Sequence, residues 1–481
     1  MLMKLLGNKI FQYLFFRYTS FGLQLLNSLL IAFLLGPGIF ANWAFILLVV
    51  QYFNQLNFGI PQALNNVLSI SKEDVIVCET AFQKSFTGIL ILNLLTIIFF
   101  GVQYFGWIQL GNEFDFGEFL WLVCFWVITN QILILLINVN RIYGQLKEIN
   151  LYQLMPQVSI FIFLLIWRTE ISITKILWVW LTSNIVSIVL LWRVIPLRLG
   201  RNGDLRFNDL LGRKGLLLFV YNSSFYLIVV IVRSLSSSNF TSVDFAYMSF
   251  AFTCANSVIL LIDSFSFIAF PKLLGKFSKM SEVQLQRSLE QLRLEYSTIV
   301  GGLAFVFISV YAFGIQLSQE YRDTLLMFIL FLGSQIVLSR SFGISIVLMA
   351  KGREAQLAVI AFLSLVVGSM ATWIFICYLD FLISWSISGI YVAYITFAIG
   401  LQILYGDMHQ SKRNIIRILV SLFSFRLFSP LILAVILAVL KVDPIFLSAP
   451  LLLFCLLNIR GSILVWKRLK MLMNSPGVID L

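Results

Sequence analysis

Long apolar runs dominate the chain and recur from one end to the other, with short polar segments between them. Most are close to the roughly 20 residues that an α-helix needs to cross a bilayer. The pattern therefore predicts an all-α polytopic membrane protein with about 14 transmembrane helices. The predicted spans are 10–35, 41–66, 85–107, 119–139, 151–167, 176–195, 216–237, 243–268, 296–316, 324–349, 357–377, 385–405, 418–440 and 445–465.

Composition and charge narrow the class further. Hydrophobic residues make up 60% of the 481 residues and charged residues 12%, and the mean hydropathy is +0.95. These values exclude a soluble enzyme, a disordered chain and a disulfide-rich secreted protein. If the N-terminus lies inside and the spans alternate, inside segments hold 25 of the 34 Lys and Arg residues and outside segments hold four. The positive-inside rule therefore explains the net charge of +12 without nucleic acid, and it predicts cytoplasmic N- and C-termini.

The spans fall into two similar halves and an addition. We interpret 1–195 as an N-terminal six-helix lobe, 196–215 as a basic cytoplasmic linker and 216–406 as a C-terminal six-helix lobe. Residues 407–481 add two transmembrane helices and a cytoplasmic tail. An even number of helices per lobe predicts parallel repeats, with a substrate path at their interface. Residues 280–295 have helical periodicity and mixed charge; we interpret them as a solvated connector, with a surface helix as the alternative.

Polar side chains follow one face of several predicted spans, notably the first, second and seventh. At helical spacing, the polar positions of each of these spans fall on one side. Any single Asn or Gln is well explained by a hydrogen bond between helices. Stripes that continue for three or more turns predict a shared hydrated cleft instead. The residues predicted to line it are Arg17, Gln24, Asn27, Asn54, Asn222, Arg233 and, in the tenth span, Arg340.

Charged groups at membrane depth are functional candidates because they are costly to bury. Arg17 and Arg233 lie on the polar stripes of equivalent helices, and Arg340 lies near the middle of its predicted span. Arginine suits phosphate because its charge is permanent and its planar group donates hydrogen bonds in pairs. These positions predict an anionic, diphosphate-containing substrate. Asp263 is the deepest acid, and we expect it either to carry a proton or Na⁺ or to pair with an arginine.

Enzyme signatures are absent from the sequence. There is no P-loop, no Cys/His cluster and no nucleophile with a His partner, and the five cysteines lack disulfide or metal spacing. We therefore expect no catalytic residue, no metal site and no cofactor. A membrane glycosyltransferase or polymerase, kept as the less favoured alternative, would be expected to have a sizeable outer loop, whereas all predicted outer segments are short.

Several segments resemble the bacterial O-antigen and polysaccharide flippases of the multidrug/oligosaccharidyl-lipid/polysaccharide exporter superfamily. They are 34-LLGPGIFANWAFILLVVQYFNQLNFGIPQAL-64, 270-FPKLL-274, 351-KGREAQ-356 and 387-ISGIYVAYITFAIG-400. The resemblance extends over most of the chain and rests on the order and spacing of these short segments. The acid that the family often has near the end of the second helix is Asn57 here, which adds Asn57 to the predicted cleft. The Asp-Arg pair often found in the seventh helix is Val232-Arg233, which leaves Asp263 as the stand-in for ion coupling.

The resemblance implies two lobes that alternate between inward- and outward-facing states. It implies export of an undecaprenyl-diphosphate-linked oligosaccharide, such as an O-antigen or capsule repeat unit, across the bacterial inner membrane. Expected partners are this lipid-linked oligosaccharide, membrane lipids, H⁺ or Na⁺, and a polymerase and chain-length regulator of polysaccharide synthesis. The main alternative is a small-molecule cation or drug antiporter of the same superfamily, which would be expected to have a more acidic cleft.

Overall fold

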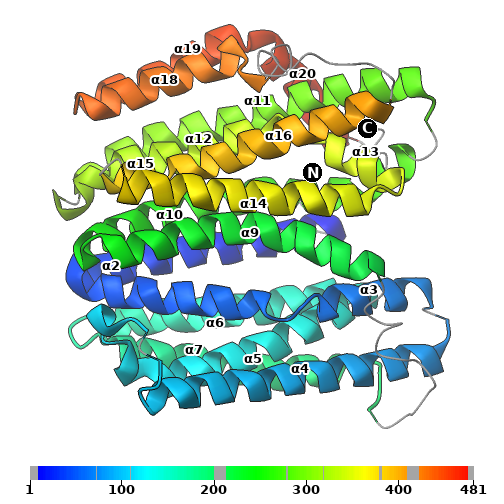
Figure 1. Cartoon of the computed structure of the whole chain (residues 1–481), viewed down its shortest axis with the longest axis vertical. Coiled ribbons are helices and arrows are strands. Elements are labelled where there is room, and N and C mark those ends of the chain that lie inside the picture. The colour runs from blue at the N-terminus through cyan, green and yellow to red at the C-terminus, as the bar shows by residue number, and fades with distance from the viewer. Residues whose placement is uncertain are drawn as a thin grey trace. The chain divides into compact units, whose positions relative to one another are not determined.

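The computed structural model describes residues 9–71, 73–108, 110–199, 213–277, 280–317, 319–378, 382–408 and 422–474. Side chains are described in these ranges except at 9–14, 213–215, 262–272, 274–276, 407–408, 468–474 and the single positions 66, 70, 112, 146, 317 and 319. Every regular element in the described ranges is an α-helix or a short 3-10 helix (Figure 1). The predicted all-α class is confirmed.

The chain forms two compact units, which are described separately. Unit 1 comprises residues up to Ser223 together with Thr241–Ala246, and unit 2 comprises Ser224–Phe240 and Tyr247–Leu481. The long helices α9 (Arg213–Asn239) and α10 (Ser242–Phe277) each contribute to both units.

Unit 1 is built from helices that correspond to the first six predicted spans. They are α2 (Lys9–Gln55), α3 (Ile60–Ile70), α4 (Val75–Tyr104), α5 (Phe116–Ile142), α6 (Leu146–Ile166) and α7 (Ile173–Val194), with the 3-10 helix η1 (Asn112–Phe114) before α5. Helix α2 holds two predicted spans, joined at Gly36, whose φ of 71° and ψ of 167° interrupt the helical geometry. A positive φ is readily adopted by glycine because it has no Cβ, and Pro37 follows at once.

Unit 2 contains the remaining helices. They are α11 (Glu282–Gly314), α12 (Leu325–Ser339), α13 (Ile344–Ala350), α14 (Glu354–Cys377), α15 (Ile383–Ser386), α16 (Ser388–Met408), α18 (Phe425–Val439), α19 (Ala449–Leu457) and α20 (Ile459–Asn474), with 3-10 helices η2 (Ile315–Leu317), η3 (Gln319–Thr324) and η4 (Pro444–Ser448). Within this unit, α14 packs along α16, while α18 packs on α12, and α19 and α20 pack on α11.

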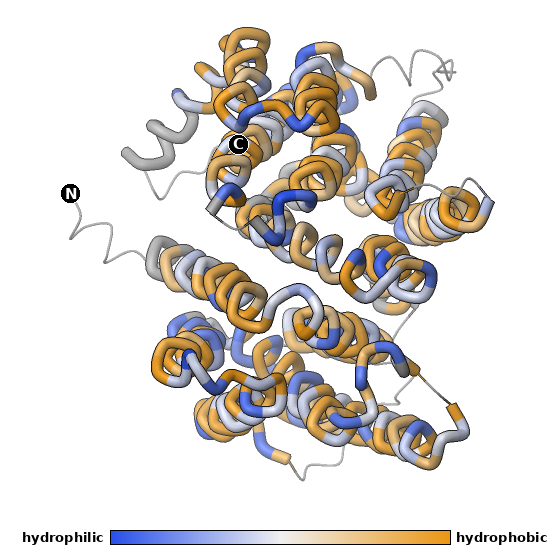
Figure 2. The backbone as a smooth tube through the Cα atoms, turned by 90° about the vertical axis from the view of Figure 1, so that its left-hand side faces the viewer, coloured by the Kyte–Doolittle hydropathy of each residue, from blue (hydrophilic) through white to orange (hydrophobic). Residues whose placement is uncertain are grey.

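Each predicted span has a helical counterpart. In the described part of the chain, 11 helices are long and apolar enough to cross a membrane, and the number is 12 if the bent pair Pro444–Leu457 and Ile459–Lys467 counts as one span. Counting the two halves of α2 separately and adding the shorter apolar α18 accounts for the remaining two predicted spans. Figure 2 shows hydrophobic residues on most turns of these helices.

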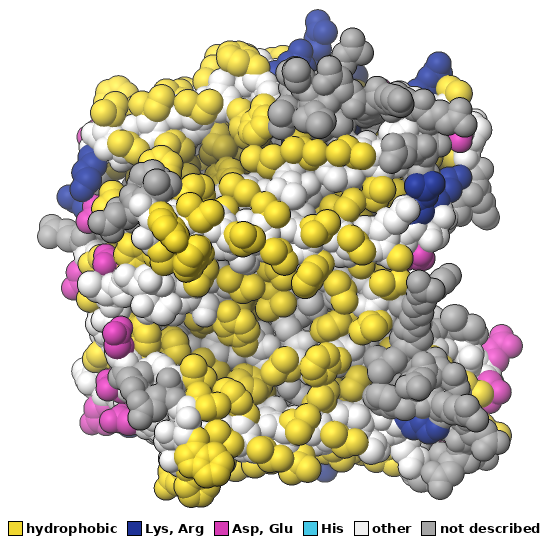
Figure 3. All heavy atoms as spheres, in the orientation of Figure 1, with side chains coloured by type: hydrophobic (Ala, Val, Ile, Leu, Met, Phe, Trp, Pro, Cys, Tyr) yellow, Lys and Arg dark blue, Asp and Glu magenta, His cyan; other side chains and the backbone are white. Residues whose placement is uncertain are grey.

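The outer surface of the helices is apolar. On α4, for example, Ile91, Leu94, Leu95 and Ile98 are all exposed. On the face shown in Figure 3, hydrophobic side chains cover the middle of the helices, and the charged side chains gather toward their ends. This distribution is what a lipid environment requires, because a hydrocarbon core accepts apolar side chains and excludes charge.

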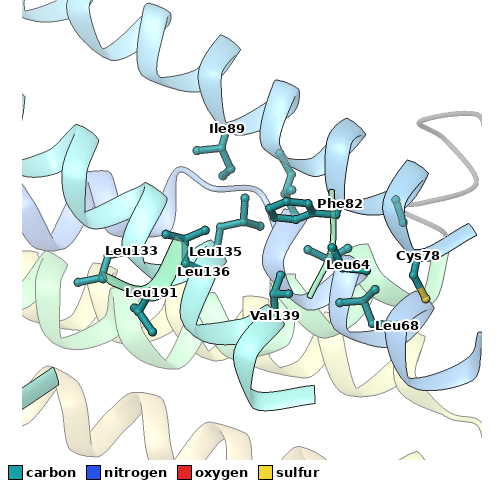
Figure 4. Close-up of a cluster of buried hydrophobic side chains, with 13 residues drawn as sticks. Leu64, Leu68, Cys78, Phe82, Ile89, Leu133, Leu135, Leu136, Val139 and Leu191 are labelled. Carbon is teal, nitrogen blue, oxygen red and sulfur yellow. The ribbon is translucent and has the colours of Figure 1, made fainter. Parts of the chain in front are cut away.

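The core of unit 1 lies where α3 meets α4 and α5. Leu64 and Leu68 of α3 pack with Phe82 of α4 and with Leu136 and Val139 of α5 (Figure 4). A second group of rings joins α2, α5 and α7: Trp43, Trp126 and Trp180 have ring centroids 4.8 to 6.0 Å apart. Lipid tails are as apolar as these side chains, so close packing rather than exclusion from water stabilises such contacts.

Three predicted spans are interrupted. The second run, 41–66, stops at Gln55 and resumes at Ile60; the tenth, 324–349, is broken between Ser339 and Ile344; and the last, 445–465, bends by 74° at Asn458. Positive φ angles at Phe58 (47°), Gly59 (77°) and Gly343 (87°) account for the first two breaks. Helical periodicity alone does not predict such local breaks, because it does not depend on the backbone angles of single residues.

Residues 280–295 fit the alternative of a surface helix better than an irregular solvated connector. Helix α11 begins at Glu282 and continues without a break into the ninth span. Ser281 forms a capping box with Gln284, which satisfies backbone N–H groups at the helix start. Leu285 and Leu289 are buried, so one face of this extension packs against unit 2.

Close packing of α14 on α16 yields a testable prediction. A Cβ added to Gly368 would lie 2.5 Å from the Cβ of Ala393 and 2.9 Å from the carbonyl oxygen of Gly389. We expect Gly368→Val to destabilise the protein by about 1–3 kcal/mol, because neither backbone can move aside cheaply. Thermal unfolding in detergent, followed by loss of the monodisperse peak in size-exclusion chromatography, measures this effect.

Gly101→Val in α4 is the matched control, since a Cβ there meets nothing within 4 Å. Equal loss of stability in both variants would contradict the role of Gly368 in helix packing.

Candidate functional site

The break between α2 and α3 is the most polar feature of unit 1. Asn57 is buried, its Oδ1 accepts a hydrogen bond from the backbone N–H of Gly59 at 3.0 Å, and its Nδ2 donates to the carbonyl oxygen of Asn54 at 2.8 Å. One side chain thus satisfies a donor and an acceptor that the interrupted helix leaves open. The structure therefore brings together two of the predicted cleft residues, Asn54 and Asn57.

Helix α5 supplies further amides to the same break. Asn130 Nδ2 donates to Asn54 Oδ1 at 2.9 Å, and Gln131 Nε2 donates to the carbonyl oxygen of Phe53 at 3.1 Å. Gln131 Oε1 is buried and accepts no hydrogen bond from the protein. The amides of α5 therefore stabilise the broken helix and leave a buried acceptor, which is suited to a hydroxyl or cationic donor.

One turn beyond the break, the polar seam continues. Asn65 Nδ2 of α3 donates to Asn138 Oδ1 of α5 at 2.7 Å, and Asn138 Nδ2 bonds back to the carbonyl oxygen of Ile134. Gln62 Oε1 and Asn65 Oδ1 are buried acceptors without a partner in the protein. Seven residues separate Gln131 from Asn138, so both lie on one face of α5.

The first half of α2 carries Arg17, Gln24 and Asn27. Asn27 is 2% exposed, and its Nδ2 donates to the backbone oxygen of Gln157 at 2.8 Å and to Gln157 Oε1 at 3.2 Å. Asn27 Oδ1 remains without a protein partner. Gln157 follows Pro156 in the shortest predicted span, 151–167. The polar residues of this span were the sequence signal that could have identified Gln157 as a candidate site residue.

Arg17 and Gln24 occupy partly exposed positions on the same helix. The Arg17 guanidinium lies 5.4 Å from the centroid of the Phe21 ring, within range of a cation–π interaction. The backbone oxygen of Gln24 accepts the Ser28 hydroxyl at 2.9 Å, so Ser28 contributes to its own helix instead of extending the polar stripe.

The start of α9 belongs to unit 1 and packs at the same break. Ser223 Oγ donates to Gln55 Oε1 at 3.2 Å, while the neighbouring Asn222 is exposed. A Cβ on Gly59 would lie 2.8 Å from the Cβ of Phe219, so this glycine is required both by its φ and by the close approach of α9.

In unit 2, Arg233 is almost completely buried, with 1% of its surface exposed. Its Nη2 donates to Ser249 Oγ of α10 at 3.2 Å, and its guanidinium lies 4.7 Å from the centroid of the Phe252 ring. Ser249 and Phe252 lie three residues apart and therefore share one face of α10. Ser249 and Phe252 thus both contact the guanidinium from α10.

Arg340 sits at the break between α12 and α13. Its Nη1 donates to Ser297 Oγ of α11 at 3.4 Å, and next to it the Phe342 ring stacks on Tyr296 with centroids 3.7 Å apart. A Cβ on Gly343 would lie 2.7 Å from Leu289 Cδ1. Contacts with α11 therefore hold this break, and Arg340 is at a helix end rather than in the middle of a continuous helix.

Asp263, predicted to couple ions, lies on α10, and its side chain is outside the described residues. Among the described residues, no group of three or more His, Cys, Asp and Glu side chains could hold a metal ion. The predicted residues form separate clusters: Asn54 with Asn57, Asn27 with Gln157, Arg233 with Ser249, and Arg340 with Ser297. The predicted common cleft remains a prediction.

Hydrogen bonds connect the start of α4 and the loop before α6 with the end of α7 and the residues that follow it. The backbone N–H of Arg198 donates to Glu79 Oε1 at 3.2 Å, and Gln145 Nε2 donates to the carbonyl oxygen of Val194 at 2.9 Å. Burial raises the pKa of Tyr143, and the neighbouring Cys78 and Glu79 raise it further. The phenol therefore stays protonated at neutral pH and remains a hydrogen-bond donor.

Comparisons with known proteins give the fold. No protein-family model matches the sequence, and no curated protein matches it. Among solved structures, the chain is similar to an inward-facing multidrug resistance MATE family transporter of the MOP superfamily, with a TM-score of 0.63 and 14% identity over 83% of this chain and 95% of that chain.

An outward-facing structure of such a transporter gives a TM-score of 0.58 with 14% identity, covering 85% of this chain and 96% of the other. A MATE structure in the straight conformation gives 0.57 with 14% identity over the same shares. At this identity the likeness establishes that the protein has a MATE-like fold, as the sequence resemblance at superfamily level implied.

The helix break in unit 1 yields a second prediction. Asn57→Leu removes both hydrogen bonds of the buried amide, so we expect it to destabilise the protein by about 1–3 kcal/mol. Asn57→Asp keeps an acceptor for the Gly59 N–H and should be tolerated better. Thermal unfolding of the purified variants in detergent checks the order, and a Leu variant as stable as the Asp variant would contradict this role of Asn57.

Proposed function

We propose that this protein is a secondary transporter that moves an anionic lipid-linked oligosaccharide across the membrane, in the manner of an O-antigen or capsule flippase. The observation that carries the proposal is the sign of the charge within the spans. Arg17, Arg233 and Arg340 lie there, whereas Asp263 is the one acid placed away from the ends of the predicted spans. A site with this balance favours a substrate that carries phosphate.

The arginine surroundings support this reading. Arg233 is buried beside a hydroxyl and an aromatic ring, so its guanidinium lies in a region of low dielectric constant. An attraction between opposite charges is stronger there than in water. A diphosphate that reached such a guanidinium would gain paired, charge-assisted hydrogen bonds.

The amides of unit 1 suit the sugar part of such a substrate. Gln131 Oε1, Gln62 Oε1 and Asn65 Oδ1 are acceptors without a hydrogen-bond partner among the described residues, and sugar hydroxyls are hydrogen-bond donors. These residues flank the break of a spanning helix, and discontinuous helices commonly form substrate sites in secondary transporters. The sugar is therefore assigned to the α3–α5 seam.

The extra length of the chain is a further argument. About 17% of this chain lies outside the match to the inward-facing MATE transporter, although 95% of that transporter is covered. This share is comparable to residues 407–481, which contain α18, α19 and α20. Additional lipid-facing helices fit a substrate whose polyprenyl tail stays in the bilayer while its head group crosses.

The mechanism follows from these assignments. The head group binds through arginines and amides, the lobes alternate between two states, and a proton or Na⁺ at Asp263 couples the cycle to an ion gradient. The transporter forms no covalent intermediate. A polymerase and a chain-length regulator would use the delivered repeat unit on the far side of the inner membrane.

Export of drugs or other small cations in exchange for ions is the second candidate. The structural neighbours are multidrug transporters, which favours it. It would place the organic cation near Asp263, because a cationic substrate needs a carboxylate partner.

Arginine variants test the site. We expect Arg17→Ala and Arg233→Ala each to abolish transport of lipid-linked repeat units at normal protein levels, because the diphosphate loses a permanent cation. Transfer of radiolabelled repeat units from the outer surface of inverted membrane vesicles to their lumen measures it. Arg426→Ala, an exposed arginine on α18, is the control that should transport normally. Full transport by both Arg17→Ala and Arg233→Ala would refute the proposed site.

A deletion strain separates the two candidates. For a flippase, lipid-linked repeat units should accumulate on the inner face, and sensitivity to cationic drugs should not change. Complementation with Asp263→Asn should leave transport uncoupled from the ion gradient. Unchanged lipid-linked pools together with drug hypersensitivity would reject the flippase and favour the antiporter.

A further inference from the structure

The last helix of the protein turns away from the helix before it. Helix α19 ends at Leu457, α20 begins at Ile459, and the two are bent by 74°. Asn458 at the corner is buried, and its Nδ2 donates to the carbonyl oxygens of Arg426 at 2.9 Å and Phe454 at 3.1 Å. These bonds satisfy carbonyls at the broken helix end and tie it to α18, so the corner is held by specific contacts.

One side of α20 is attached to unit 2. A Cβ on Gly461 would lie 2.8 Å from Thr298 Oγ1 of α11, so the two helices are in close contact at this glycine. Val465, one turn later on the same side, is half-buried. The rest of the helix with described side chains faces away from the protein.

A second side of α20 is apolar and uncovered. Ile459, Ile463 and Trp466 follow one another at spacings of four and three residues and therefore share a face. They are 57%, 49% and 64% exposed. Tryptophan at the end of such a face is typical of the interface between lipid tails and head groups.

The adjoining side carries positive charge. Arg460 and Lys467 are exposed and lie seven residues apart, which places them on one face, with the exposed Leu464 between them. Further along the helix the sequence has Arg468 and Lys470 at other angles around the axis, and α20 contains no acidic residue. A helix with one apolar and one basic side, set at a large angle to its neighbour, has the features of a helix that lies in the plane of a membrane surface.

We propose that α20 lies along the membrane surface at the C-terminal end of unit 2 and binds the phosphate head groups of anionic phospholipids. Ile459, Ile463 and Trp466 would enter the acyl boundary, and the basic residues would contact the head groups. The positive-inside pattern assigns this surface to the cytoplasmic side. Each cation near an anionic surface strengthens binding about fivefold, so loss of two should weaken it about 30-fold. The proposal does not depend on the substrate of the transporter.

Spin labelling of the full chain in nanodiscs tests the position of α20. Labels at Ile459→Cys, Ile463→Cys and Trp466→Cys, on a background without the five native cysteines, should all report the same shallow depth from relaxation by oxygen and by a nickel chelate. Lys351→Cys, in an exposed loop, is the water-exposed control. Depth that increases steadily from 459 to 466 would indicate a spanning helix, and labels shielded from both reagents would indicate contact with a second copy or another protein; either result overturns the proposal.

Changing the lipid composition tests whether the basic residues of α20 bind anionic head groups. In nanodiscs of phosphatidylcholine with phosphatidylglycerol, the label at 466 should remain in the interface, and in phosphatidylcholine alone it should become accessible to the nickel chelate. Arg460→Gln/Lys467→Gln should produce that accessibility even with phosphatidylglycerol present. The matched pair Arg193→Gln/Lys351→Gln removes two exposed cations elsewhere and should not. A label that responds to neither lipid nor variant would refute binding of anionic head groups.

Discussion

A helix that crosses a bilayer must satisfy its own backbone hydrogen bonds, because lipid offers none. At two of the interrupted spans, side chains take over bonds that the helix gives up. Asn57 and Gln131 do so between α2 and α3, and Asn458 does so between α19 and α20. The same requirement determines where polar residues occur in the described helices: many of them complete a broken or adjoining backbone.

This requirement also changes the meaning of the polar stripes. Asn27 pairs with Gln157, and Asn65 pairs with Asn138, so these amides join helices and simultaneously leave buried acceptors. The amides that join these helices are therefore the same ones that we propose to contact the substrate. An amide whose donor is fixed by a neighbour presents its oxygen in a defined direction, which is useful for recognition of hydroxyl groups.

The arginines differ from the amides because burying them carries the cost of removing a charge from water as well as the need for hydrogen-bond partners. Arg233 lies between α9 and α10 beside Ser249 and Phe252, and Arg340 reaches Ser297 from a helix end. The sign of the charge within the predicted spans, rather than the likeness to multidrug transporters, carries the proposal of an anionic substrate.

Sequence periodicity predicted the all-α class and a helix at each apolar run of the described chain, because runs of about 20 apolar residues form helices in lipid. It also identified Arg17, Arg233 and Arg340 as unusual, since charge at membrane depth is visible in the sequence itself. The breaks at 56–59, 340–343 and 458 were decided by tertiary structure, because they depend on positive φ angles and on bonds to distant carbonyls. Tertiary structure also decided that Gln157, Ser249 and Ser297 are the hydrogen-bond partners of Asn27, Arg233 and Arg340. In the sequence they look like any other Gln or Ser, and only the packing of a neighbouring helix brings them within hydrogen-bonding distance.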